Sequence, residues 1–183
     1  MRRHRKKDKE CSTELQHIYI DTCYFHAYLW GKHEEKTFSK KIMKKIENSI
    51  KKNSNIKVII PFTIVGELLN NMYQDSFDTK KIEDYFYKFL NLIEKLRADL
   101  RPSKSNEFFN IATKIREKDN RIGNTDILIL SHALCDPNSK YALFIDQDVL
   151  HSTVIRDMEE KMRQEGKRRQ KLEITSEFGK LKR

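Results

Sequence analysis

The sequence predicts an α/β domain built around a mainly parallel central β-sheet. Short apolar runs rich in strand-forming residues alternate with longer segments whose apolar residues recur at helical spacing. Strands of four or five residues separated by helices are typical of sheets whose strands run in the same direction. The chain has 183 residues, of which 38% are hydrophobic. It is therefore long enough for one domain with a full core and too short for two comfortable ones.

Four short segments carry the strand signal. The expected strands are 17–20, 56–60, 141–145 and 172–175. The first of them runs straight into Asp21, and the second is ended by Pro61. Ligands of parallel α/β sheets bind outside the carboxyl ends of the strands. The residues that follow these segments are therefore the first candidates for a functional site.

Helical segments separate the strands. The expected helices are one that stops near Gly31, then 39–53, 63–73, 78–99 (closed by Pro102), one around 108–115, one that Thr125 caps at its N-terminus, and 152–164. The helix at 39–53 is amphipathic and has a basic outer face.

Carboxylates follow the expected strand ends. Asp21 follows the first strand immediately, Asp146 follows a later one immediately, and Glu67 lies within two turns of the second strand's end. Asp126 falls in the first turn of its helix. Taken alone, Asp126 would complement a helix dipole, and Asp146 with Asp148 would form a solvated turn. Four carboxylates at converging positions are poorly explained as four separate accidents.

A shared cation explains such a cluster better. Carboxylates held close together repel one another unless they are protonated or neutralised. Hard divalent cations such as Mg²⁺ and Mn²⁺ neutralise them because these cations favour oxygen ligands. Glu67 supports this interpretation, since it lies on or near the apolar stripe of its helix, where a Glu is rarely left unpaired. The five glycines form neither a G-x-G-x-x-G nor a Walker A pattern, so no phosphate-cradling loop is expected.

The net charge of +10 is concentrated at the two ends of the chain. Residues 1–10 contribute +4 and residues 161–183 contribute +6, whereas residues 11–160 are neutral overall. Basic ends on a neutral body indicate sequence-independent attraction to a polyanion, usually nucleic acid. Solubilising tails without a specific partner are the alternative.

Nucleic-acid contacts are expected on the basic face of the 39–53 helix and at a pair of arginines near the C-terminus. These residues are Lys40, Lys41, Lys44, Lys45, Lys51, Arg168 and Arg169. Contacts of this kind position a nucleic-acid backbone without reading its sequence.

The expected location is the cytoplasm. No apolar run reaches the roughly 18 residues of a membrane helix, and the basic N-terminus is not followed by the apolar core of a signal peptide. The three cysteines are odd in number and form no C-x-x-C, which fits free thiols in a reducing compartment.

Four segments resemble the acidic motifs of PIN-domain nucleases. They are I-Y-I-D-T-C at 18–23, P-F-T-I-V-G-E-L-L at 61–69, N-T-D-I-L-I-L-S-H-A at 124–133 and F-I-D-Q-D at 144–148. Their order of Asp, Glu, Asp, Asp and the gaps of 46, 59 and 20 residues match the family. No single motif is specific, whereas the ordered set is fairly specific.

The resemblance implies a Rossmann-like three-layer fold and a divalent-metal-dependent phosphodiesterase that acts on single-stranded or structured RNA. It places Asp21, Glu67, Asp126 and Asp146 at the catalytic and metal-binding positions and Asp148 at an accessory metal position, with Mg²⁺ or Mn²⁺ as cofactor. The implied partner is RNA. A homodimer and an antitoxin are further options, because the wider family includes toxins of the VapC type.

The expected nuclease domain spans 17–175, between a basic extension at 1–16 and a basic tail at 176–183. Three positions in it depart from the family pattern: Cys23 stands for Asn or Ser, Phe144 for Thr or Ser, and Val149 for an aromatic residue. A hydroxyl lost at Phe144 would remove a hydrogen bond that orients a metal-bound water. The sequence thus predicts a metal-dependent endoribonuclease. A non-catalytic RNA-binding protein and a toxin of a toxin-antitoxin pair are the alternatives.

Overall fold

The computed structural model describes residues 14–103 and 105–178. In this part of the chain, five strands form one all-parallel sheet in the order β3-β2-β1-β4-β5. The strands are β1 (Gln16–Ile20), β2 (Ile56–Pro61), β3 (Asp99–Arg101), β4 (Ser139–Leu143) and β5 (Glu173–Thr175). The helices are α1 (Thr22–Leu29), α2 (His33–Lys52), α3 (Phe62–Asp75), α4 (Thr79–Lys95), α5 (Asn106–Lys118), α6 (Asn124–Cys135), α7 (Gln147–His151) and α8 (Thr153–Gln164). The predicted α/β class with a parallel central sheet is confirmed.

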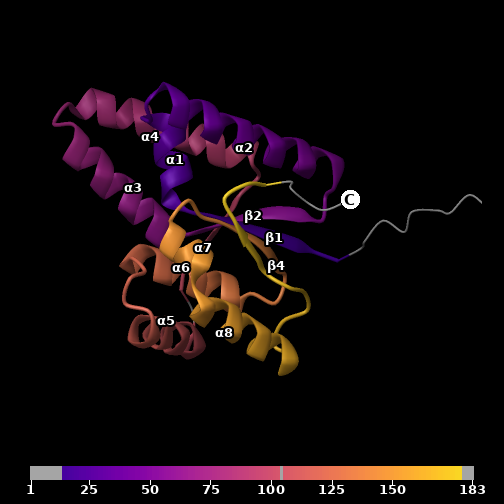
Figure 1. Cartoon of the computed structure of the whole chain (residues 1–183). Coiled ribbons are helices and arrows are strands. Elements are labelled where there is room, and N and C mark those ends of the chain that lie inside the picture. The colour runs from indigo at the N-terminus through magenta and orange to yellow at the C-terminus, as the bar shows by residue number, and fades with distance from the viewer. Residues whose placement is uncertain (1–13, 104, 179–183) are drawn as a thin grey trace, which may run out of the picture.

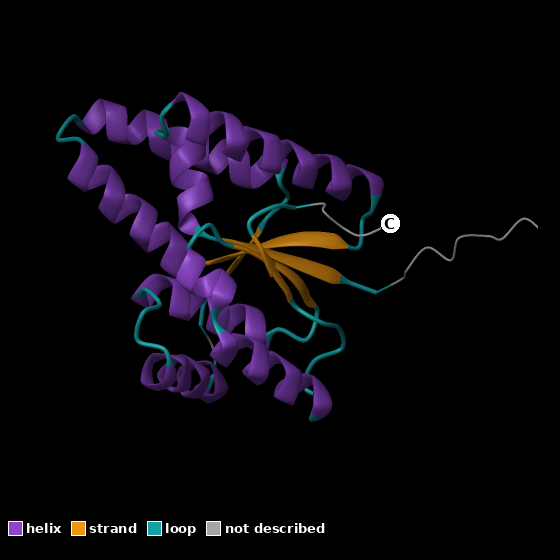
Figure 2. Cartoon of the chain, viewed as in Figure 1, coloured by secondary structure: helices purple, strands orange, loops and turns teal. Residues whose placement is uncertain are grey.

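Helices cover both faces of the sheet and give the fold three layers (Figures 1 and 2). α1, α2 and α4 lie on one side of the sheet, and α5, α6 and α8 lie on the other. α3 packs against α4 and also against α6, so it connects the two helical layers. None of the helices in the described residues combines the length and apolar composition that a membrane crossing needs.

The core lies against β1, β2 and β4. Ile18, Ile20 and Ile59 are fully buried, because helices cover both faces of the central strands. The register aligns Ile20 with Leu143, which brings the carboxyl ends of β1 and β4 side by side. The chain moves outward from β1 in one direction to β2 and β3 and in the other to β4 and β5. The junction of β1 and β4 is therefore the topological switch point at which α/β sheets bind ligands.

The single helix expected at 78–99 ends at Lys95, and β3 begins at Asp99. α4 stops earlier because Arg97 adopts a left-handed φ of 46°. Its N–H donates to the Glu94 carbonyl at 2.9 Å. The following N–H, of Ala98, donates to the Ile93 carbonyl at 3.0 Å. These two bonds form a Schellman motif in which Arg occupies the position that Gly usually takes, so no glycine marks the helix end in the sequence.

Three further boundaries differ from the prediction. Gly123 caps α6, so Thr125 lies inside the helix rather than at its cap. β4 ends two residues earlier than expected, and Asp146 is instead the N-cap of the short helix α7. α2 begins at His33, because the segment H-E-E-K-T-F lacks the apolar periodicity on which the expected start depended.

The C-terminal segment belongs to the domain beyond the expected boundary at 175. The Phe178 ring is buried and packs edge-on against Tyr141, with ring centroids 5.3 Å apart. The Tyr24 hydroxyl donates to the Ser176 carbonyl at 2.7 Å. Residues 176–178 are therefore packed against the body of the domain. Of the expected extensions at 1–16 and 176–183, residues 1–13 and 179–183 lie outside the described residues.

Candidate active site

A cleft of about 460 Å³ opens at the carboxyl edge of the sheet. It is lined by Asp21, Thr22, Cys23, His26, Glu67, Asn71, Asp126, Ile145 and Asp146. The four carboxylates come from four separate elements: the β1–α1 junction, α3, the first turn of α6 and the N-cap of α7. The tertiary structure thus gathers the four acidic residues that the sequence singled out.

The backbone holds Asp21 at the edge of the sheet. Its N–H donates to the carbonyl of Leu143 at 3.0 Å, which extends the contact between β1 and β4 by one residue. Burial raises the pKa of Asp21 to about 6. A hydrogen bond from the Cys23 thiol opposes this rise, and the charge of Glu67 adds to it.

Asp126 experiences the repulsion of the whole cluster. Burial, followed by the charges of the other three carboxylates, raises its pKa to about 7. A helix N-terminus favours the charged form of an Asp, and burial and repulsion act in the opposite direction here. Gly123 leaves room for this side chain, because a Cβ at that position would lie 3.0 Å from Asp126 Oδ2.

Glu67 contributes a carboxylate oxygen that lacks a hydrogen bond. Its Oε2 atom is buried, and no described residue donates to it. Asn71 lies one turn later on α3 and lines the same cleft. A buried carboxylate oxygen without a donor is unfavourable unless a cation or a donor reaches it.

Asp146 and Asp148 occupy different environments. Asp146 lines the cleft and caps α7 by accepting the Asp148 N–H at 2.7 Å. The Asp148 side chain is not among the residues that line the cleft, and Arg121 Nη1 lies 3.6 Å from its Oδ1. The structure therefore does not bring Asp148 into the cluster.

The donor chemistry of the cleft fits a hard divalent cation. Four carboxylates and one amide face it, and oxygen is the ligand that Mg²⁺ and Mn²⁺ prefer. The partnerless Oε2 of Glu67 is a further ligand candidate. Within residues 14–103 and 105–178, no three His, Cys, Asp or Glu side chains are already close enough to hold a metal ion. Cation binding would thus draw the carboxylates inward against their repulsion.

Two residues that line the cleft, Asn71 and His26, were not predicted as site residues from the sequence. Asn71 follows Glu67 by four positions on one helix, and this spacing places both on the same face. His26 follows Thr22 by four positions on α1, and its Nε2 lies 3.2 Å from an oxygen of Asp75. Helical spacing from a known carboxylate could have found Asn71. The pairing of His26 with α3 depends on the tertiary fold.

The lysines of α2 do not share one surface. Lys40 and Lys44 face α4 and line grooves with Lys95. Lys45 instead donates to the Phe178 carbonyl at 3.3 Å. Lys51 lies in the last turn of α2, next to the start of β2 and thus at the edge of the sheet opposite the cleft, and pairs with Glu47 at 2.6 Å. Lys41 is exposed and lines neither groove.

The prediction that Arg168 contacts nucleic acid is wrong. Its guanidinium is buried and donates to the carbonyls of Ala133 at 2.7 Å and Leu134 at 2.8 Å, in the last turn of α6. It also donates to the Ser139 carbonyl at 2.7 Å. Arg168 thus satisfies carbonyls that the end of a helix leaves without partners. Arg169 is exposed, but it lies beside the start of β4, away from the cleft.

Phe144 faces the core rather than the cleft. Its side chain is fully buried, and its N–H donates to the Thr175 carbonyl at 3.1 Å. The next residue, Ile145, lines the cleft and is 41% exposed. Val149 is also buried in the core. In this chain, then, positions 144 and 149 support packing.

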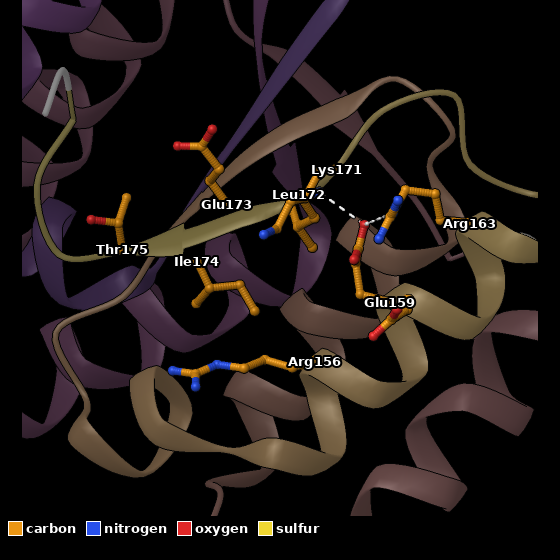
Figure 3. Close-up of a pocket in the computed structure, with 9 residues that line it drawn as sticks. Arg156, Glu159, Arg163, Lys171, Leu172, Glu173, Ile174 and Thr175 are labelled. Atoms are coloured by element: carbon orange, nitrogen blue, oxygen red, sulfur yellow. Dashed lines mark hydrogen bonds and ion pairs between the residues drawn. The ribbon is translucent and has the colours of Figure 1, made fainter. Parts of the chain in front are cut away.

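A second depression, of about 580 Å³, lies between α8 and β5 (Figure 3). Two of its charged side chains, Glu159 and Arg163, are already paired with each other. Glu159 accepts the Leu172 N–H at 3.1 Å, and its Oε1 lies 3.8 Å from Arg163 Nε. Buried polar groups that satisfy one another stabilise structure and offer little to a ligand. The acidic cleft is therefore the stronger candidate site.

Comparison with known proteins finds a similar fold among solved structures. No protein-family model and no curated protein matches the sequence. Among solved structures, the chain is similar to one chain of VapBC2 from Rickettsia felis, determined bound to a DNA fragment from their promoter. The TM-score is 0.52 at 15% sequence identity, and the match covers 86% of this chain and 98% of that chain. At this identity the likeness concerns the fold, and the α/β sheet and its layers match a PIN-like three-layer arrangement.

Proposed function

We propose that this protein is a Mg²⁺- or Mn²⁺-dependent endoribonuclease that hydrolyses phosphodiester bonds of RNA. One observation carries the proposal: four carboxylates from four elements line one cleft at the switch point of the sheet. None of Asp21, Glu67, Asp126 and Asp146 forms an ion pair with a described residue, so their charge is available to a cation. Asp21 and Asp126 also have raised pKa values, and uncompensated carboxylates with such shifts are typical of functional sites.

The four carboxylates and the Cys23 thiol have separate roles in this proposal. Asp21, Asp126 and Asp146 would hold the cation directly or through water. A bound divalent cation supplies a water of lowered pKa and balances charge on the phosphate in the transition state. The free Oε2 of Glu67 would orient the attacking water or accept its proton. The Cys23 thiol would position Asp21 through their hydrogen bond.

Two other functions remain alternatives. A non-catalytic RNA-binding protein would keep the fold and the acidic cleft; the absence of a preassembled metal group among the described residues favours it. A toxin held inactive by an antitoxin is the second, and the likeness to a chain of VapBC2 favours it. A small neighbouring gene would support the toxin. A homodimer is compatible with all three functions.

A nuclease assay separates the enzyme from the binder. Purified protein is incubated with mixed structured and single-stranded RNAs in EDTA, Mg²⁺ or Mn²⁺. We expect internal cleavage with either metal and none in EDTA. Binding without cleavage under all conditions would contradict the proposed activity. Cleavage in EDTA would contradict its dependence on metal.

A further inference from the structure

A basic groove runs between α2 and α4. Both helices lie on the same side of the sheet (Figure 1). It consists of two adjoining depressions of about 400 and 240 Å³, which share Tyr28, Lys40 and Lys95. Its charged side chains are Lys36, Lys40, Lys44, Lys88, Lys95 and Glu47. Five positive charges thus face one negative charge along one groove, although residues 11–160 as a whole are neutral.

Most of this positive charge is available to a ligand. Lys40, Lys44 and Lys95 are exposed and form no ion pair with any residue that the structure describes. Lys88 pairs with Asp84 at 2.5 Å, and Glu47 pairs with Lys51. The uncompensated lysines therefore attract a polyanion.

Aromatic rings connect the groove to the acidic cleft. His26 lines the cleft and stacks on Trp30, with ring centroids 5.2 Å apart and planes 21° apart. Trp30 contacts Tyr85 with centroids 4.5 Å apart, and Tyr85 lines the groove. Lys88 Nζ lies 5.3 Å from the centre of the Tyr85 ring. His26, Trp30 and Tyr85 are all only partly buried, so part of each residue remains accessible to solvent.

We propose that the groove between α2 and α4, together with the ring series His26, Trp30 and Tyr85, holds the single-stranded flank of an RNA whose scissile phosphate lies in the acidic cleft. This inference rests on the proposed nuclease function for the position of the cleaved bond. Lysines track the phosphates, and unpaired bases stack on the rings, which is the combination found in proteins that bind single strands. Paired bases in a duplex could not stack in this way.

Charge changes on α2 test the groove without disturbing the core. The double variant Lys40→Gln with Lys44→Gln removes two groove charges. Its matched control, Lys41→Gln with Lys52→Gln, makes the same change at two exposed positions of the same helix outside the groove. The probe is fluorescein-labelled 12-nucleotide oligo(U), and its binding is measured by anisotropy in EDTA across a salt series. Duplex RNA of equal length is the competitor.

We expect the groove variant to bind oligo(U) about tenfold or more weakly at 0.1 M salt and to lower the log–log salt slope by about 1.4, since each phosphate contact contributes about 0.7 on a single strand. The control should bind like the wild type. An equal loss of affinity in both variants would contradict the proposed role of the groove. Equal affinity for duplex and single-stranded RNA would contradict it as well.

The tryptophan supplies an independent readout, because the chain contains one Trp, at position 30. Oligo(U) should quench its emission on binding, whereas heparin, a polyanion without bases, should bind without quenching. If oligo(U) binds and leaves the emission unchanged, the ring path is wrong.

The results can contradict the proposed binding role of the groove without contradicting the proposed nuclease activity, and the reverse. If the wild type cleaves RNA and the groove variant binds and cleaves as well as the control, only the proposed binding role of the groove is wrong. If the binding and quenching results hold but no metal supports cleavage, the proposed activity fails and the groove remains as a single-strand binding site.

Discussion

Protonation of Asp126 links the acidic cleft to the stability of the protein. The pKa of this side chain rises from 3.8 in an open chain to about 7 in the fold. A raised carboxyl pKa means that the folded state binds the proton more tightly than the unfolded state does. The resulting stabilisation is fully present below about pH 3.8 and is lost as the pH rises through about 7.

We predict that metal-free protein loses stability between pH 4 and pH 7 because of this group. The loss at Asp126 should be roughly 1 to 2 kcal/mol, since one pKa unit is about 1.4 kcal/mol and solvent screens a half-buried site. Urea unfolding in EDTA at several pH values measures it. Asp126→Asn should show a smaller decline than the wild type. Parallel pH profiles would show that this carboxyl does not carry the effect.

A second prediction compares two aspartates that are two positions apart. Asp146 lines the cleft, whereas Asp148 lies beside Arg121. Asp146→Asn should reduce metal-dependent cleavage by on the order of a hundredfold or more, because ligand loss should exceed the 10- to 100-fold cost of losing an outer-shell partner. Asparagine can still cap α7, so the circular dichroism spectrum should not change.

Asp148→Asn is the matched control and should retain most of the cleavage rate. Equal loss in both variants would assign Asp148 to the metal site after all. Full activity of Asp146→Asn would remove it from the site.

At the scale of the element, Arg168 stabilises the end of α6. Its guanidinium donates to carbonyls of the last helical turn and to Ser139, and Glu159 Oε1 lies 3.6 Å from its Nε. Arg168→Gln should destabilise the domain by about 3 to 5 kcal/mol, because it leaves buried carbonyls without their donor and removes a buried positive charge from beside Glu159. The exposed neighbour gives the control: Arg169→Gln should change stability by less than about 0.5 kcal/mol.

Thermal unfolding measures both variants. For a domain of this size, each kcal/mol corresponds to about 2 to 4 °C, so the two melting temperatures should differ by on the order of 10 °C. Similar small shifts in both would contradict the role of Arg168 as a helix cap.

At the scale of the whole molecule, metal binding should stabilise the fold. A cation that binds only the native state contributes about 2.7 kcal/mol at 100 times its dissociation constant, which raises the melting temperature by several degrees. We predict that millimolar Mn²⁺ raises the midpoint and that EDTA reverses the shift. No change with Mn²⁺ would argue against a cation site in the cleft.

Asp126→Asn separates the two explanations of this residue in the same experiment. If Asp126 belongs to the cluster, Asp126→Asn should be more stable than the wild type without metal, because it relieves repulsion. The variant should also respond less to Mn²⁺, because it removes a ligand. If Asp126 is only a charge at the helix end, Asp126→Asn should be slightly less stable than the wild type, and its response to Mn²⁺ should be unchanged.

The sequence by itself determined the α/β class and the acidic residues of the cleft. Both depend on local pattern: strands and helices have different apolar periods, and Asp21 follows its strand directly. Once parallel strands are assumed, residues after their carboxyl ends must meet at one edge. Asp21, Glu67 and Asp146, which follow the expected strands, could therefore be named in advance, whereas Asp126, in the first turn of α6, was added by its place in the order of the motifs.

Only the tertiary structure decided which charges face solvent, the core or the cleft. Arg168 and Arg169 are adjacent in sequence, yet the first is buried and the second exposed. The three-residue strand β3 pairs with β2 after a helix end that has no glycine. The division of the lysines on α2 depends on the position of α4. These features arise from contacts between residues far apart in the chain, and no local pattern encodes such contacts.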